Sequence, residues 1–261
     1  VMGEVDDLES VVHMGACSTT TERDADYLYD NNYRYSTEIA EFALDQGARF
    51  IYASSAATYG AGENGYDDME MDLRPLNMYG YSKHIFDQWV HEQGVADQVV
   101  GLKFFNVFGP NEYHKGAQAS MVSKAFHQVQ QTGSVRLFQS TTDEYGDGEQ
   151  RRDFIYVKDV VRVVMELLDR PDVVGLYNVG TGKARSFKDL ATAVFAACEQ
   201  PAVIEYVEMP EEISRHYQSF TEAKMDRLMT ALPGMTFTGL EDAIADYVTG
   251  YLQTEWPYIE G

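Results

Sequence analysis

Two residues four positions apart, Tyr79 and Lys83, have the side-chain types and the spacing that proton-transfer chemistry requires. In a helix this spacing places both side chains on one face, one turn apart. An ammonium group near a phenol favours the phenolate, so we expect Lys83 to lower the pKa of Tyr79 and make Tyr79 a general acid or base near neutral pH. Taken alone, such a pair could also be solvated on the surface of a helix.

Two serines, Ser54 and Ser55, follow a short apolar run at residues 50–53 that predicts a buried parallel strand. Hydroxyl groups at the carboxyl end of a strand lie at the edge where open α/β sheets bind their ligands. A loop with several glycines then leads to the helix that begins at Tyr79. We therefore favour an active site over a surface pair, and we expect Ser55 to hydrogen-bond the substrate oxygen whose proton Tyr79 transfers.

The rest of the chain alternates between short apolar strands and helical patterns, which predicts an α/β fold. The expected strands lie at residues 10–13, 50–53, 99–105, from 151 onwards, 176–179 and 204–207. The expected helices lie at about residues 24–46, 79–93, 119–131, 159–168, 186–199, 221–229 and 240–252. The Gly-Thr-Gly at residues 180–182 lacks the full phosphate-loop pattern and is interpreted as a turn.

The composition limits the partners of the chain. Its 261 residues can bury a sizeable core, and 42 acidic against 20 basic residues give a net charge of −22. This acidity argues against nucleic acid or an anionic membrane as a partner, and no apolar run approaches the roughly 20 residues that span a bilayer. Cys17 and Cys198 lack the spacing of a metal site or a redox pair, so we expect no metal and a reducing, cytoplasmic location.

Ser55, Tyr79 and Lys83 together match the Ser … Tyr-x-x-x-Lys pattern of the extended short-chain dehydrogenases/reductases, which include nucleotide-sugar epimerases and dehydratases. Longer motifs, from about Gly3 to about Tyr251, resemble the ADP-L-glycero-D-manno-heptose 6-epimerases of that family. In chain order these motifs are H-M-G-A-C-S-T-T-T-E, D-N-N-Y, Y-A-S-S-A-A-T-Y-G, P-L-N-M-Y-G-Y-S-K, F-F-N-V-F-G-P-N-E-Y-H-K-G, R-D-F-I-Y-V-K-D-V, N-V-G-T-G-K-A-R-S-F and Y-Q-S-F-T. The H-K-G after N-V-F-G-P and the late Y-Q-S-F-T are the most specific.

The resemblance implies a Rossmann-type doubly wound parallel sheet with a smaller α/β carboxy-terminal lobe. Residues 1–115 would be the remainder of an NADP-binding domain, and residues 116–261 mainly a substrate-binding lobe, with parts of 150–185 returning to the first domain. It also implies that roughly 60 residues precede Val1 in the complete protein, including the glycine-rich loop and the residue that reads the cofactor ribose. The implied cofactor is NADP, with NAD possible, and the implied assembly is a ring-like homo-oligomer such as a pentamer.

The activity implied by the resemblance is inversion of carbon 6 in an ADP-linked heptose, for supply of lipopolysaccharide core heptose. Carbon 6 would be oxidised transiently to a ketone by tightly bound NADP and then reduced on its other face. Tyr79 and Lys115 would be the two acid/base groups that serve the two poses of the intermediate. Lys83 would also bind the nicotinamide ribose, and Ser55 would hydrogen-bond the reacting oxygen.

The resemblance also assigns binding residues. Those implied near the cofactor are Met14, Gly15, Ala16, Cys17, Ser18, Asn31, Lys83 and Val107. Those implied near the substrate are Ser55, Asn106, Ala117, Lys124, Phe138, Gln139, Ser140, Thr141, Arg152 and Tyr217. Ala117 and Lys124 depart from the pattern, because the heptose epimerases commonly have a polar residue at the first position and some have a histidine at the second. Arg152 is expected to reach a phosphate, and an ion pair with Asp153 is the alternative.

Two other functions remain open. The first is another nucleotide-sugar epimerase or dehydratase, such as a UDP-hexose 4-epimerase; a dehydratase is disfavoured because Ala56, Ala57 and Thr58 supply no acid beside the central serine. The second is a non-catalytic nucleotide-binding module, which would explain why no glycine fingerprint opens the chain.

Overall fold

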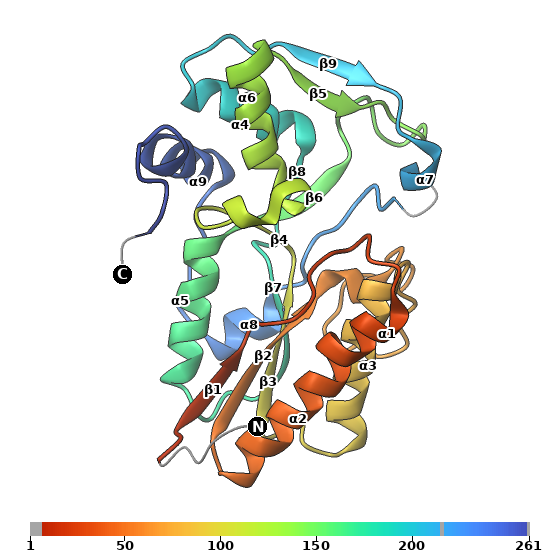
Figure 1. Ribbon diagram of the computed structural model, residues 1–261, viewed down its shortest axis with the longest axis vertical. Coiled ribbons are helices and arrows are strands. Elements are labelled where there is room, and N and C mark those ends of the chain that lie inside the picture. Colours follow the sequence, from red (N-terminus) through yellow and green to blue (C-terminus); the bar gives the residue numbers. More distant parts are fainter. Residues whose placement is uncertain (1–6, 215–216, 260–261) are drawn as a thin grey trace. The chain divides into compact units, whose positions relative to one another are not determined.

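The structure is a computed structural model that describes residues 7–214 and 217–259 (Figure 1). These residues gather into two compact units. The first unit comprises the chain up to Phe104 together with Val163–Val179 and Lys224–Gly234, and the second comprises Phe105–Arg162, Gly180–Ala223 and the chain from Met235 onwards. We expected residues 1–115 to bind the cofactor and residues 116–261 mainly to bind the substrate. This division by binding role stays a prediction.

The first unit is built on four parallel strands. They are β1 (Ser10–His13), β2 (Arg49–Ser55), β3 (Val99–Phe104) and β7 (Gly175–Val179), in the order β1-β2-β3-β7. Their register places Ser55 opposite Phe104 and Phe104 opposite Val179. The carboxyl ends of these strands therefore meet at one edge, where open α/β sheets bind their ligands.

Two helices, α2 (Tyr35–Asp45) and α3 (Met78–Glu92), pack together on one face of this sheet (Figure 1). Small and aromatic side chains fill the contact: Ala40, Ala43, Ala48, Phe50, Tyr52, Phe86, Val90 and Val99. The start of α3 is fixed because the side chain of Asn77 accepts a hydrogen bond from the backbone nitrogen of Gly80 at 2.8 Å. On β7, the short helix α8 (Asp226–Ala231) packs against the strand.

The helix expected at residues 24–46 has a change of geometry near its start. Asp24 caps α1 (Ala25–Leu28), a π-helical segment, η1, follows at Tyr29–Arg34, and α2 continues to Asp45. Such π-helical turns are rare and frequently occur at functional sites. The buried side chain of this segment is that of Asn32.

The second unit combines short strands with helices. Strand β4 (Asn106–Phe108) pairs in parallel with β6 (Arg151–Tyr156), which pairs antiparallel with β8 (Ala184–Ser186). The other pair is β5 (Val135–Phe138) with β9 (Ile204–Val207). The helices and helical turns of this unit are η3 (Tyr113–Gln118), α4 (Met121–Thr132), α6 (Phe187–Ala197), α7 (Glu211–Ser214), α9 (Leu240–Tyr247) and η4 (Val248–Leu252), and α5 (Val157–Leu168) continues from β6 into the first unit.

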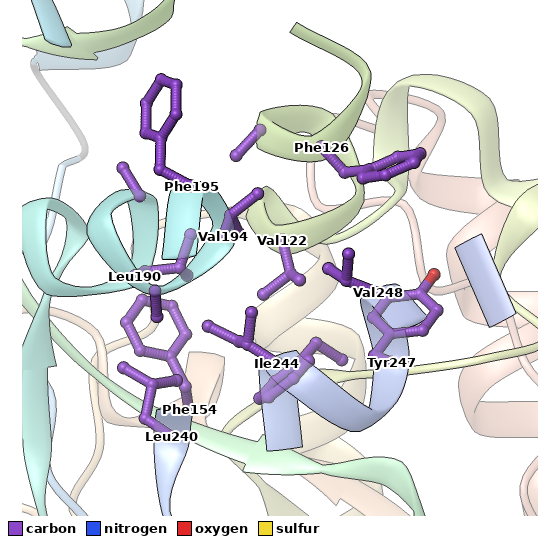
Figure 2. Packing of buried hydrophobic residues seen from close by; sticks show 14 of the residues in the cluster. Val122, Phe126, Phe154, Leu190, Val194, Phe195, Leu240, Ile244, Tyr247 and Val248 are labelled. Carbon is purple, nitrogen blue, oxygen red and sulfur yellow. The ribbon is translucent and has the colours of Figure 1, made fainter. Parts of the chain in front are cut away.

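Helices α4, α6 and α9 pack around one apolar cluster in the second unit (Figure 2). Its labelled members are Val122, Phe126, Phe154, Leu190, Val194, Phe195, Leu240, Ile244, Tyr247 and Val248. Burying one such aliphatic or aromatic side chain contributes about 1.5–3 kcal/mol, so α9 is held firmly in place by its apolar face.

Most of the expected elements are present, with a clear exception at residues 221–229. The helix there begins only at Asp226, because the backbone before it forms hydrogen bonds with residues of β6 instead. The backbone nitrogen of Thr221 donates to the carbonyl oxygen of Arg151 at 3.2 Å, and that of Ala223 donates to a carboxylate oxygen of Asp153 at 3.0 Å. Within the described residues, no helix combines the length and the apolar character needed to cross a membrane.

Candidate active site

Ser55 and Tyr79 lie together at the carboxyl edge of the first unit's sheet. Ser55 ends β2 and Tyr79 is in the first turn of α3, where the hydroxyl of Ser55 is near enough to the phenol to lower its pKa in part. The phenol is buried, with 9% of Tyr79 exposed. Gly80 allows this close approach, since a Cβ there would lie 2.7 Å from the carbonyl oxygen of Ala57, in the turn η2 (Ala56–Tyr59) that follows β2.

Lys83 lies one turn further along α3 and is also buried. Its ammonium group donates a hydrogen bond to the carbonyl oxygen of Ala53 at 3.1 Å, two residues before Ser55 on β2. Burial lowers the pKa of Lys83 to about 8, and the nearby carboxylate of Asp87 partly opposes this shift.

The pKa of Tyr79 differs from the sequence-based expectation. It is raised above the ordinary value, first because the phenol is buried, while the nearby hydroxyl of Ser55 lowers it in part. Desolvation penalises the phenolate more than the polar surroundings stabilise it. The expectation that the pKa of Tyr79 falls below its ordinary value is therefore wrong for this structure, because burial outweighs the groups that favour the phenolate.

A buried charge network lies one further turn along α3. The carboxylate of Asp87 accepts hydrogen bonds from Tyr52 at 3.1 Å, from Ser54 at 2.7 Å and from the ammonium group of Lys103 at 2.9 Å. Lys103 also donates to the hydroxyl of Thr58 at 2.7 Å. Tyr52 and Ser54 flank the residue whose carbonyl oxygen binds Lys83, so this network fixes β2 against α3 just before Ser55.

Asn32 is a site residue that the sequence analysis missed. Its amide bonds the backbone nitrogen and carbonyl oxygen of Cys17 at 2.8 and 2.9 Å, and donates to the hydroxyl of Ser82 at 2.9 Å. It therefore ties the segment of residues 14–18 to the turn of α3 between Tyr79 and Lys83. The spacing could have identified it, because Leu28, Asn32 and Ser36 recur at intervals of four and so lie on one face of a helix. In the structure all three are buried.

The other residues expected near the cofactor in this unit follow β1. Met14, Gly15 and Ser18 are exposed, whereas Ala16 and Cys17 are half-buried. The amide of Asn31, unlike that of Asn32, donates to the carbonyl oxygen of Tyr27 at 2.8 Å within its own helix. Their contacts with a cofactor stay predictions.

His13, which ends β1, is buried beside these residues. Its ring is 2.9 Å from the hydroxyl of Ser36. Burial and the positive charge of Lys83 lower the pKa of His13 to about 4, so the imidazole is neutral at physiological pH.

In the second unit, three of the expected substrate residues lie together. The guanidinium group of Arg152 lies 4.9 Å from the ring centre of Tyr217, and the ring of Tyr217 meets that of Phe138 at 6.4 Å. A guanidinium group stacked on an aromatic ring can bind two oxygens of a phosphate through N–H groups at its edge, and one nitrogen of Arg152 also donates to the carbonyl oxygen of Arg151 at 2.8 Å. This arrangement is suited to the phosphate contact expected of Arg152.

The carboxylate of Asp153 is occupied by the turn at residues 180–182. It accepts hydrogen bonds from the backbone nitrogen and hydroxyl of Thr181 at 2.8 and 2.7 Å and from the backbone nitrogen of Gly182 at 2.9 Å. The interpretation of Gly-Thr-Gly as a turn is confirmed. These contacts, with that of Ala223, hold Asp153 in a structural role, while Arg152 faces the aromatic rings.

The remaining substrate and cofactor candidates of the second unit lie on β4, in loops and near the start of α4. Asn106 is exposed and Val107 half-buried on β4, while Lys115, Ala117, Lys124 and Thr141 are exposed. Gln139 and Ser140 are half-buried, and the backbone nitrogen of Ser140 donates to Asp147 at 2.8 Å. Tyr79 and Lys115 belong to different compact units, and the pairing of their roles stays a prediction.

The sequence matches the family model described as "NAD dependent epimerase/dehydratase family" over residues 1–180. This chain belongs to that family. The sequence-based recognition is thereby confirmed at family level, and so is the expectation of a nicotinamide-dependent enzyme of the epimerase type.

Known members of the NAD dependent epimerase/dehydratase family resemble the chain over nearly all of its length. It is 55% identical to the ADP-L-glycero-D-manno-heptose-6-epimerase of Nitratidesulfovibrio vulgaris (strain DP4), over 97% of this chain and 79% of that protein. It is 47% identical to the protein of that name from Fusobacterium nucleatum, over 97% of this chain and 80% of that one. The crystal structure of the Helicobacter pylori enzyme of the same name matches with a TM-score of 0.80 and 28% identity, over 93% of this chain and 72% of that one. The expected α/β architecture is confirmed by this match.

Proposed function

We propose that the chain catalyses the interconversion of ADP-D-glycero-D-manno-heptose and ADP-L-glycero-D-manno-heptose by inversion at carbon 6. The observation that carries this proposal is the buried phenol of Tyr79 beside Ser55, with Lys83 one turn away, in a chain that shares 55% identity with a heptose epimerase. The product would supply heptose for the lipopolysaccharide core.

The residues present fit a nicotinamide cofactor. Gly15 follows β1 and would meet no heavy atom within 4 Å if it carried a Cβ, so the backbone there is open to close approach. Lys83 offers an ammonium group at the same sheet edge, suited to the hydroxyls of a ribose. We propose that residues 14–18, Asn31, Lys83 and Val107 hold the cofactor, which is NADP, with NAD as the alternative.

A bound nicotinamide would supply the hydride chemistry at carbon 6, both for the oxidation and for the reduction that follows. In its phenolate form, Tyr79 would take the hydroxyl proton as carbon 6 is oxidised, while Ser55 hydrogen-bonds the same oxygen and fixes its position. Lys83, one turn away, would offset by its charge part of the cost of burying the phenolate that accepts this proton.

After the ketone presents its other face, Lys115 would supply the proton to the oxygen as carbon 6 is reduced with inverted configuration. Two proton donors are required because the oxygen points in different directions in the two poses. Asn106, Ala117, Lys124, Phe138, Gln139, Ser140, Thr141, Arg152 and Tyr217 would bind the nucleotide sugar.

Three further features belong to this proposal. Residues 1–115 would form the cofactor-binding part and residues 116–261 mainly the substrate-binding part. The protein would act in the cytoplasm. It would assemble as a ring-like homo-oligomer such as a pentamer.

The test is proton NMR of ADP-D-glycero-D-manno-heptose incubated with the complete gene product. Appearance of the L-glycero epimer without added reductant would establish the substrate, the reaction and recycling of a bound cofactor together. An unchanged substrate, with the cofactor shown to be bound, would contradict the heptose assignment. A panel including UDP-hexoses would then test the nearest alternative, a UDP-hexose epimerase, while Ala56, Ala57 and Thr58 disfavour a dehydratase because they supply no acid beside Ser55. A chain that binds nucleotides but turns over none of the panel would be the non-catalytic module.

A further inference from the structure

The loop that carries Lys115 is bound by the last described residues of the chain. The hydroxyl of Tyr113 donates a hydrogen bond to the carbonyl oxygen of Pro257 at 2.5 Å, and its ring meets that of Tyr258 edge to face at 5.3 Å. The backbone nitrogen of Ile259 donates to the side chain of Asn111 at 3.2 Å. Residues 253–259, here called the C-terminal segment, therefore hold the loop on both sides of Glu112.

Glu112 fixes the same loop from within the second unit. Its buried carboxylate accepts hydrogen bonds from the backbone nitrogen and hydroxyl of Ser120 at 2.7 and 2.6 Å, and from the hydroxyl of Tyr247 at 3.0 Å. Ser120 is the residue that caps α4, and Tyr247 is part of the packed cluster of α9 shown in Figure 2. The base of the loop is thus tied to two helices that the apolar core holds in place.

Lys115 lies inside the short turn between these attachments. Its backbone nitrogen donates to the carbonyl oxygen of Glu112 at 2.9 Å, and Gly116, at φ 51°, turns the chain back directly after it. The side chain of Lys115 is itself exposed. Its position is therefore set by the backbone that carries it, and that backbone depends on Glu112 and on the C-terminal segment.

The C-terminal segment reaches the loop from the fixed helix α9. After η4, the hydroxyl of Thr254 donates to the carbonyl oxygens of Tyr251 and Trp256 at 2.8 and 2.9 Å, which turns the chain. Trp256 and Tyr258 remain 63% and 45% exposed, so these aromatic residues do not serve the core of the unit. Because they lie on the surface, we infer that the segment contributes to the structure through its contacts with the loop, at Tyr113 and Asn111.

We propose that the C-terminal segment is a positioning element for Lys115, acting through Tyr113 and Asn111. This inference rests on the proposed function, in which Lys115 is the second acid/base group. Displacing such a group by about 1 Å costs turnover on the order of a hundredfold, without a matching loss of substrate binding. The segment then contributes to kcat although none of its residues contacts the reacting atoms.

The experiment compares the complete protein with a form shortened to end at Thr254 and with the variant Tyr113→Phe, which removes one hydroxyl. Hydrogen exchange of the peptide that covers residues 111–120 reports on the loop directly, and kcat and KM report on catalysis. We expect faster exchange and at least about tenfold lower kcat in the shortened form, a smaller change of the same kind in Tyr113→Phe, and KM and cofactor content within a few-fold. Tyr206→Phe, an exposed tyrosine on β9 of the same unit, is the matched control and should change neither.

A second comparison shows whether the effect passes through Lys115. In the background Lys115→Ala, shortening the chain should cost no further turnover, because the group being positioned is already gone. Unchanged exchange and turnover in the shortened form, or losses that multiply in the double variant, would overturn the inference. Full turnover of Lys115→Ala alone would instead overturn the acid/base role given to Lys115 under the proposed function.

Discussion

Asp87 lies one helical turn beyond Lys83 on α3, and it forms its ion pair with Lys103 of β3, with the two charged groups 2.9 Å apart and both fully buried. The pair has three further hydrogen-bonding partners, Tyr52, Ser54 and Thr58. A buried ion pair of this kind is stabilising relative to either charge alone, although two apolar residues of similar size can replace it at little cost. Its effect here is to join β2, β3 and α3 next to Ser55 and Lys83.

Replacing Lys103 with methionine should therefore destabilise the protein strongly. The carboxylate of Asp87 would remain buried without its counter-charge, which costs about 3–5 kcal/mol in the free energy of unfolding. Urea unfolding followed by circular dichroism measures this value. The double variant Lys103→Met with Asp87→Leu removes both charges and should recover more than half of the loss. A double variant that is less stable than Lys103→Met would show that the pair does not act as a unit.

Replacing Tyr79 with phenylalanine should lower turnover by about 10²–10⁴-fold, which is the usual contribution of a positioned acid/base group. The phenol ring stays in place, so cofactor affinity should remain within a few-fold. Ser55→Ala should lower turnover less, because it removes only a hydrogen bond to the oxygen. Initial rates and cofactor titration measure the two quantities separately. Near-normal turnover of Tyr79→Phe would exclude it as the acid/base group.

The sequence was sufficient to predict the strands of the first unit and the approach of Ser55 to Tyr79. Runs such as residues 50–53 are apolar because both faces of a parallel strand are buried, and a four-residue spacing fixes a helix face. Both signals are local in the chain. They also determined that the hydroxyls would meet at the carboxyl edge of the sheet.

The parts that could not be predicted depend on burial or on contacts between distant residues. Lys103 and Asp87 are charged, and charged residues are normally solvated, so only the folded structure reveals that they pair in the interior. The raised pKa of Tyr79 has the same origin, because spacing predicts the neighbour and does not predict the desolvation. The contact of Tyr113 with Pro257 joins residues 144 positions apart, and no periodicity reports it.

The pKa of Lys83 predicts a pH dependence of stability. Folding lowers this pKa from 10.5 to about 8, so between these values the unfolded chain binds more protons than the folded one, and stability rises with pH. Below about pH 8 both states are protonated and the full cost of burying the charge, about 3 kcal/mol, is present. Relative to Lys83→Met, the complete protein should therefore gain stability between pH 8 and pH 10. Urea unfolding at both values tests this, and a constant difference between the two proteins would contradict it.

Asn32 supports a prediction with a matched control in the adjacent residue. Replacing Asn32 with alanine would leave the buried backbone groups of Cys17 and the hydroxyl of Ser82 without their partner, at about 1–3 kcal/mol for each unsatisfied group. Residues 14–18 would also lose their attachment to α3, so cofactor affinity should fall together with stability. Asn31→Ala removes an amide that bonds within its own helix, and we expect a loss of stability below about 1 kcal/mol. Thermal unfolding without cofactor compares the two variants, and added cofactor is used for Asn32→Ala against the unchanged protein, because Asn31 is itself proposed to contact the cofactor. If Asn31→Ala destabilised the protein as much as Asn32→Ala does, the attachment would not be the function of this buried amide.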